Sequence, residues 1–187
     1  MFIDRGTVLL ALARSAIARS LNLPAPRTRN AWWLLKPGAS FVTLTRDGSL
    51  RGCVGTVRSH RLLLNDVKLN AVAAASRDPR FTPLKHNELA SVLIEVSVLS
   101  ALETIDFDGE KDAIAQLRPR IDGVLMEYRG KRGTFLPQVW EVLPAREEFF
   151  AQLKIKTSLP RNFCADDLKL WRYTVSKWKE SELQAAA

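Results

Sequence analysis

The sequence predicts an α+β fold in which most strands pair antiparallel. Residues 92–99 alternate strictly, with Val92, Ile94, Val96 and Val98 on one face, as expected of a half-buried strand. The dipeptide Asp47-Gly48 separates two β-rich runs and is a strong signal for a two-residue hairpin turn. Residues 62–76 are rich in alanine and typical of a helix. Helices and hairpins mixed in this way indicate an antiparallel sheet flanked by helices.

The first half of the chain is expected to begin with a helix at residues 7–21, with Thr7 as its N-cap. Prolines 24 and 26 end this helix and open a loop. Residues 41–45 and 49–57 form the hairpin around Asp47-Gly48, and the Ala-rich helix stops at Asp78-Pro79. The second half is expected to contain a short helix at 111–117, a hairpin of 122–128 with 132–136 around Arg129-Gly130, a helix at 147–156 and a final strand at 170–179.

Length and composition indicate one globular domain, residues 1–187, with room for a small sub-lobe. Hydrophobic residues make up 47% of the chain, and no apolar run approaches the roughly 18 residues that span a bilayer. The two cysteines are far apart and form no metal-ligand cluster with the two histidines, so we expect no metal, no cofactor and a cytoplasmic location. A net charge of +8, concentrated near both ends, is compatible with an anionic partner or with a basic solvated surface.

The segment Leu50-Arg51-Gly52-Cys53-Val54-Gly55 is the strongest candidate for a site. Residues i and i+2 of a strand share a face, which would place Arg51 and Cys53 about 7 Å apart at their Cα atoms. Arg51 would then favour the thiolate of Cys53 or bind an anionic group in a bidentate pair. Gly52 and Gly55 leave the backbone open to close approach.

The hairpin register decides between a catalytic and a structural Cys53. A simple two-residue turn pairs Leu44 with Arg51 and Val42 with Cys53, which would put the thiol in the core. A bulge at Gly52 would re-aim both side chains. Both alternatives stay open at the level of the sequence.

Three further positions are candidates, each with a structural alternative. Arg80 either adds a second cation beside Arg51 or pairs with Asp78 in a turn. Gln138 either hydrogen-bonds a ligand amide or carboxyl, or belongs to a tight turn. Glu95 is an acid/base candidate only if it enters a cleft, and His60 and His86 are expected in exposed loops.

Four separated segments form a recognisable series: FVTLTRDGSLRGCVGT at 41–56, NAVAAASRDPRFTPL at 70–84, ELASVLIEVSVLS at 88–100 and DGVLMEYRGKRGTFLPQVWEVLP at 122–144. Together they resemble the AMMECR-like family, also called AmmeMemoRadiSam system protein A. The resemblance implies an antiparallel sheet flanked by helices, a smaller lobe, and a cleft lined by the RGCVG segment and the segments near DPRF and LPQVW. It also implies genomic company with a Memo-type protein and a radical S-adenosylmethionine enzyme. It implies no particular reaction.

Three functional hypotheses follow. In the first, a cleft around Arg51, Gly52, Gly55, Arg80 and Gln138 binds a small anionic molecule or a peptide carboxylate, with Cys53 as candidate nucleophile. In the second, the chain is a non-catalytic partner subunit of the Memo-type and radical S-adenosylmethionine modification system. In the third, the basic termini bind nucleic acid, although no nucleic-acid-reading motif accompanies the charge. The chain has no P-loop, GxGxxG, GxSxG or HExxH motif, so the corresponding chemistries lack their signatures.

Overall fold

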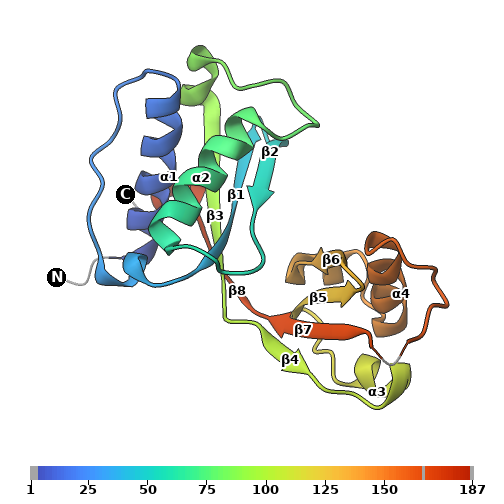
Figure 1. Cartoon of the computed structure of the whole chain (residues 1–187). Helices are drawn as coiled ribbons and strands as arrows, with labels where there is room; N and C mark the ends of the chain where they lie inside the picture. Colours follow the sequence, from blue (N-terminus) through green and yellow to red (C-terminus); the bar gives the residue numbers. More distant parts are fainter. Residues whose placement is uncertain (1–3, 166, 186–187) are drawn as a thin grey trace. The chain divides into compact units, whose positions relative to one another are not determined.

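The chain divides into two compact units in a computed structural model that describes residues 4–165 and 167–185. The first unit comprises the residues up to Leu99 together with those from Ser176 onward, and the second is Ser100–Val175. Each unit contains one four-stranded antiparallel sheet with helices, so the α+β class predicted from the sequence is confirmed (Figure 1).

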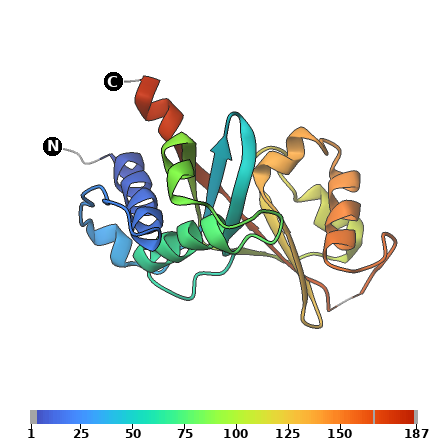
Figure 2. The same cartoon turned by 90° about the horizontal axis from the view of Figure 1, so that it is seen from above.

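The sheet of the first unit has the strand order β2-β1-β3-β8. Its elements are α1 (Arg5–Ser20), η1 (Trp32–Leu35), β1 (Ala39–Arg46), β2 (Ser49–Gly55), α2 (Leu63–Ser76), η2 (His86–Ser91), β3 (Val92–Leu99), β8 (Val175–Lys179) and α5 (Glu180–Ala185). Helices α1 and α2 pack against each other and against one face of this sheet, as both views of the chain show (Figures 1 and 2). The apolar core lies between these helices and the strands.

The alternation of β1 and β3 explains which face of the sheet the helices cover. Val42 and Leu44 of β1 and Ile94 and Val96 of β3 are paired across the two strands and are almost completely buried. Because side chains alternate along a strand, Thr43 and its neighbours point to the other side. We call that side the helix-free face, and it carries Thr43, Cys53 and Glu95, whose side chains are half-buried.

The second unit has the strand order β4-β7-β5-β6. Its elements are β4 (Glu103–Ile105), α3 (Gly109–Ala115), β5 (Gly123–Tyr128), β6 (Lys131–Phe135), η3 (Pro137–Glu141), α4 (Arg146–Lys156) and β7 (Lys169–Tyr173). Helix α4 packs on β6 and on α3, and the core includes Trp140 stacked on Phe149 with ring centroids 3.7 Å apart.

Both predicted hairpins are confirmed, and each turn has the backbone conformation that its residues favour. Asp47 and Gly48 have φ angles of 50° and 76°, and Arg129 and Gly130 have φ angles of 46° and 82°. Two successive residues with positive φ match the right-handed twist of the flanking strands, as in a type I′ turn. A glycine at the second position of each turn makes this conformation accessible.

Two sequence predictions about elements were wrong. The N-cap of α1 is Asp4 and not Thr7, because Oδ2 of Asp4 accepts from the Thr7 amide at 2.8 Å and from the Thr7 hydroxyl at 3.0 Å. The expected single strand at 170–179 is two strands, β7 and β8, which belong to different sheets. The two strands are separated at Thr174, whose carbonyl accepts from the amide of Ser100 and whose amide donates to the Ser100 hydroxyl. Ser100 is the residue that directly follows β3.

Candidate functional site

A one-residue bulge in β2 determines where Cys53 points. Thr45 pairs with Leu50, but the next pair is Leu44 with Gly52, so Arg51 is the extra residue on β2. An extra residue reverses the alternation of every side chain that follows it. Of the two alternatives that the sequence left open, the simple register is therefore excluded and the bulge is present. The extra residue is Arg51, one position before Gly52.

As a consequence, Cys53 pairs with Thr43 and not with Val42. Its thiol lies on the helix-free face, is half-buried and forms no disulfide. The hydroxyl of Thr43 donates to the Cys53 sulfur at 3.4 Å. The structure thus removes Cys53 from the core between the strands and helices and leaves the residue half-buried.

A charged group lies one strand further along the same face. Glu95 is the register partner of Thr43 on β3, and its two carboxylate oxygens lie 3.6 Å and 3.7 Å from the Nζ atoms of Lys177 and Lys179 on β8. Glu95 is therefore held by two ammonium groups. Pairing with neighbouring lysines is usual for a lone carboxylate on a strand.

The two glycines of the segment are approached by the protein itself. Gly52 lies on the helix-covered face, and a Cβ there would be 2.1 Å from the carbonyl oxygen of Ala74 in α2. A Cβ on Gly55 would be 2.2 Å from the Phe41 ring and 2.6 Å from the Ser40 carbonyl oxygen. Close approach to the backbone, which the sequence predicted at both positions, is thus used for packing within the first unit.

Arg51 is tied to the loop and short helix that follow α2. Its Nε and Nη2 donate to the two carboxylate oxygens of Glu88 at 3.3 Å and 3.2 Å, and its Nη1 donates to the Thr82 carbonyl at 3.0 Å. The side chain is only 14% exposed. The pKa of Glu88 is lowered, first by the hydrogen bond from the Lys85 amide and then by Arg51. Every nitrogen of this guanidinium is engaged, so Arg51 braces the bulge.

Asp78 connects Cys53 to Arg80. Its carboxylate is 2% exposed and accepts from the Cys53 amide at 2.8 Å and from Nε and Nη2 of Arg80 at 2.9 Å and 2.7 Å. The bidentate hydrogen bond from Arg80 holds the pKa of Asp78 well below its usual range, aided by the Cys53 amide and opposed by burial. Asp78 is therefore a buried anion that fixes both partners.

Arg80 is the cation next to the Cys53 backbone that keeps a donor available. Its side chain is 55% exposed, it lies 5.4 Å from the Phe81 ring centroid, and its Nη2 is 3.5 Å from the Cys53 carbonyl oxygen. The pKa of Arg80 is raised, first by the hydrogen bond to Asp78 and further by the charge of Asp78, against the opposing effect of burial. Among the described residues, Nη1 of Arg80 has no hydrogen-bond acceptor.

Some of the predicted site residues lie together in the first unit, and one belongs to the second unit. Arg51, Cys53 and Arg80 belong to one cluster in the first unit. Gln138 lies on η3 of the second unit, where its side chain is exposed and has a partner of its own. Its neighbour Trp140 is a core residue that donates to the Asp122 carbonyl at 2.7 Å. His60 and His86 are both exposed.

Sequence reasoning missed Thr43, Glu88 and the double role of Asp78. Thr43 could have been found only with the correct register. Asp78 was interpreted as a turn former, and its reach to a strand 25 residues earlier leaves no trace in local sequence. The signal that was present is the combination of an acidic residue and an arginine two positions later at the end of a buried helix.

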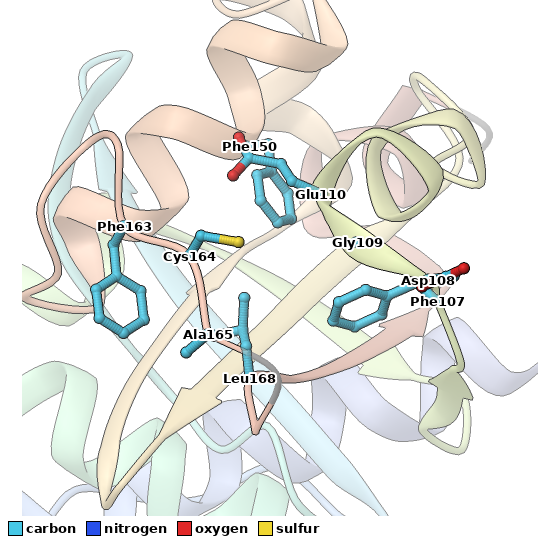
Figure 3. A pocket seen from close by; sticks show the side chains of 9 residues that line it. All are labelled: Phe107, Asp108, Gly109, Glu110, Phe150, Phe163, Cys164, Ala165 and Leu168. Carbon is cyan, nitrogen blue, oxygen red and sulfur yellow. The ribbon is translucent and has the colours of Figure 1, made fainter.

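The second unit contains a separate cavity of about 210 Å³ between α3, α4 and the loop before β7. Figure 3 shows the Cys164 sulfur pointing toward the Phe150 ring inside this cavity. Two residues that line this cavity, Glu110 and Phe150, contact the completely buried Lys154 of α4. Its Nζ lies 2.6 Å from Oε2 of Glu110 and 5.2 Å from the Phe150 ring centroid. Phe107, Phe163 and Leu168 supply apolar walls.

Two searches over the described part of the chain found nothing further. No helix among residues 4–165 and 167–185 has both the length and the apolar character needed to cross a membrane. Within the same residues, no three or more His, Cys, Asp or Glu side chains come together as a metal site would require.

The fold and these motifs define an α+β protein whose RGCVG strand is bulged and braced by Asp78 and Glu88. A model of the AMMECR1 family matches residues 10–178, and the chain belongs to that family. A protein of Methanothermobacter thermautotrophicus is 33% identical over 187 residues, covering 95% of both chains. A protein of Thermococcus onnurineus is 35% identical over 192 residues, covering 94% of this chain and 90% of the other.

A solved structure has the same fold. It is the crystal structure of the uncharacterized protein PH0010 from Pyrococcus horikoshii, with a TM-score of 0.83 and 30% sequence identity. The match covers 94% of this chain and 91% of that chain. The expectation of family membership drawn from the sequence motifs is therefore confirmed.

Proposed function

We propose that the first unit binds a small anionic molecule or a peptide carboxylate beside Cys53, with Arg80 as the receiving cation and Cys53 as nucleophile. The observation that carries this proposal is the Asp78 bridge. One buried carboxylate holds the backbone of Cys53 and two nitrogens of Arg80, while the third guanidinium nitrogen keeps its donors. A guanidinium fixed in this way loses little freedom when it binds an oxyanion.

The arrangement assigns different roles to the residues of the predicted cleft. Arg51 positions the bulge through Glu88 and Thr82, and Gly52 and Gly55 permit close packing within the unit. Thr43 donates a hydrogen bond to the sulfur, which would still be an acceptor after the thiol lost its proton. Only Cys53 and Arg80 would contact a bound molecule in this proposal. A role for Gln138 stays a prediction, as do the Memo-type and radical S-adenosylmethionine partners and nucleic-acid binding.

The test compares an anionic and a neutral reagent for the same thiol. In a Cys164→Ser background, Cys53 is the only cysteine of the chain. Its rates of alkylation by iodoacetate and by iodoacetamide are measured from pH 6 to pH 10, a range set by the roughly 8.5 pKa of a free cysteine. We expect the Arg80 cation to raise the rate of alkylation by iodoacetate relative to the rate by iodoacetamide. Arg80→Gln should therefore lower the ratio of the iodoacetate rate to the iodoacetamide rate by about threefold to tenfold.

The iodoacetamide rate is the internal control, because a merely distorted variant would change both rates together. Arg77→Gln removes an exposed guanidinium three residues before Arg80 and should leave the ratio unchanged. A ratio that is the same in the wild type and Arg80→Gln would overturn the anion site. A thiol that reacts with neither reagent below about pH 9 would overturn the nucleophile role.

A further inference from the structure

An exposed apolar patch lies on the first unit and does not involve the Cys53 cluster. Four large apolar side chains make up this patch: Trp32 is 69% exposed, Leu35 60%, Leu62 37% and Leu69 51%. Large apolar side chains are usually exposed singly, whereas a contiguous group indicates an interaction site.

The four residues form one surface because η1 and the beginning of α2 are joined. The Leu63 amide donates to the Lys36 carbonyl at 2.9 Å, the Gly38 amide donates to the Arg61 carbonyl at 3.2 Å, and Pro37 forms a β-bridge with Leu62. Figures 1 and 2 both show η1 beside the first turn of α2. The segment that follows η1 therefore adjoins Leu62 at the start of α2.

Leu69 extends the same surface along the outside of α2. It lies seven residues after Leu62, the N-cap of α2, and its side chain is 51% exposed on the outside of the helix. The opposite side of α2 carries Val67, Ala71 and Ala74, which are buried in the core. Exposed apolar side chains therefore occur in η1, at the N-cap of α2 and on the outer side of α2, where Asn65 is also exposed.

The charges of the two segments that build the patch have one sign. Residues 19–38 and 56–77 contain eight cationic side chains, namely Arg19, Arg27, Arg29, Lys36, Arg58, Arg61, Lys68 and Arg77. Their one acidic residue, Asp66, is completely buried and accepts hydrogen bonds from Ser40, Thr56, Asn70 and Arg61. Three of these cations, Lys36, Arg61 and Lys68, are sequence neighbours of Leu35, Leu62 and Leu69, and neither segment has an exposed carboxylate. Lys36 lies directly over the Trp32 ring, with Nζ 4.8 Å from the centroid.

We infer that the Trp32, Leu35, Leu62 and Leu69 patch docks an acidic amphipathic segment of a partner protein, with apolar anchors at i, i+3, i+4 and i+7 and carboxylates flanking them. Charge complementarity selects an acidic occupant. Three of the four anchors are leucines, whose aliphatic surface is matched by apolar side chains of a helix laid across it. Single-stranded nucleic acid would instead need several exposed aromatic rings on which successive bases stack. Trp32 is the one strongly exposed ring of this patch, because Trp33 is half-buried and its ring is covered by the Arg5 guanidinium.

The experiment is a selection from a displayed library of random 16-residue peptides, with the full chain immobilised. We expect enriched peptides to be acidic and to repeat apolar residues at helical spacing. Their affinity, measured by fluorescence anisotropy, should fall at least tenfold for Trp32→Ala and for Leu69→Ser. Both substitutions change exposed side chains, so the fold is expected to survive.

The matched control is Leu50→Ser, which removes a 42% exposed leucine from the hairpin of the same unit and should leave the affinity unchanged. A library that yields no enriched peptide, or peptides without acidic residues, contradicts the inference. So does binding that Trp32→Ala and Leu69→Ser leave intact. Labelled oligouridine and vesicles of phosphatidylserine with phosphatidylcholine are tested in parallel. Tighter binding of either one than of the selected peptides, lost in the same two variants, would overturn the protein-partner assignment.

Discussion

The backbone amide of Cys53 donates to Oδ2 of Asp78 at 2.8 Å, and this bond joins the bulged strand to the end of α2. The same carboxylate binds Arg80, so one buried anion determines the positions of a thiol and a guanidinium. A strand bulge alone would re-aim Cys53 without fixing it. The proposed site therefore depends on Asp78 as a positioning residue that need not touch a bound molecule.

Asp78→Asn is expected to destabilise the protein by about 1–3 kcal/mol at neutral pH. The amide oxygen can still accept from the Cys53 amide, but the NH2 group then faces the Arg80 guanidinium or leaves it unpaired. The pKa of Asp78 is lowered in the folded state, so its contribution is present above the unfolded value of about 4 and is lost as the pH falls through the folded value. The stability difference between wild type and variant should shrink steadily below about pH 4.

Urea unfolding at a series of pH values from 7 to about 2 measures this difference. Asp47→Asn is the matched control, because it removes an exposed carboxylate from the hairpin turn of the same unit. A gap between the wild type and Asp78→Asn that is equally large at the lowest and highest pH would show that the carboxylate charge is not what Cys53 and Arg80 require.

Gly52→Ala is expected to lower the free energy of unfolding by about 3 kcal/mol, the upper end of the range for overpacked sites. The added methyl group would lie 2.1 Å from the Ala74 carbonyl oxygen, and the backbone of a helix cannot turn aside as a flexible side chain can. Helix α2 must therefore move away from β2 or the bulge must change. Thermal unfolding of the full chain measures the cost, and Cys53 alkylation reports whether the bulge has changed.

Ser49→Ala, on the exposed end of the same strand, is the comparison for Gly52→Ala and should change stability by less than about 0.5 kcal/mol. If Gly52→Ala proves as stable as Ser49→Ala, the close packing of α2 against β2 is not what determines the position of the bulge.

Local chemistry predicted much of the fold. Asp47-Gly48 predicted its hairpin because a type I′ turn needs two residues that tolerate positive φ. The alternation at 92–99 predicted β3 with its bounds, since one face of that strand is buried by helices. Both signals lie within the residues that form the structure, so no tertiary contact was needed to interpret them.

The register of the site could not be predicted, because its cause is a tertiary contact. The turn residues fit a regular hairpin as well as a hairpin with a bulge three residues beyond the turn. The bulge at Arg51 places Gly52 on the helix-covered face, where only a residue without a side chain leaves room for the Ala74 carbonyl. The position of Cys53 therefore follows from how α2 packs.

The end of the chain shows the same limit. Residues 170–179 have the composition of one strand, but the backbone of Thr174 bonds to Ser100 and the chain leaves one sheet there for the other. Asp78 is a second example of this limit. The Asp-Pro dipeptide predicts a turn, but it does not indicate that Oδ2 of Asp78 accepts a hydrogen bond from the Cys53 amide. Sequence reasoning found Cys53 and Arg80 as residue types and missed the carboxylate that connects them.

The buried ion pair of the second unit gives the last prediction, in which the two partners respond differently to removal. Glu110→Gln should destabilise the protein by about 2–4 kcal/mol, because the Lys154 ammonium is completely buried and would keep only the Arg161 carbonyl and an amide oxygen as partners. Lys154→Met should change stability by less than about 1.5 kcal/mol. It keeps an apolar stem under the Phe150 ring, and the Glu110 carboxylate left behind is 39% exposed and can be hydrated.

Urea unfolding of the wild type, both single variants and the double variant completes a double-mutant cycle, and hydrogen exchange of the β5 and β6 amides assigns the change to this unit. The double variant should be about as stable as Lys154→Met, because the cost of Glu110→Gln arises from the stranded ammonium. A double variant that instead shows the sum of both single losses would mean that Glu110 and Lys154 contribute independently.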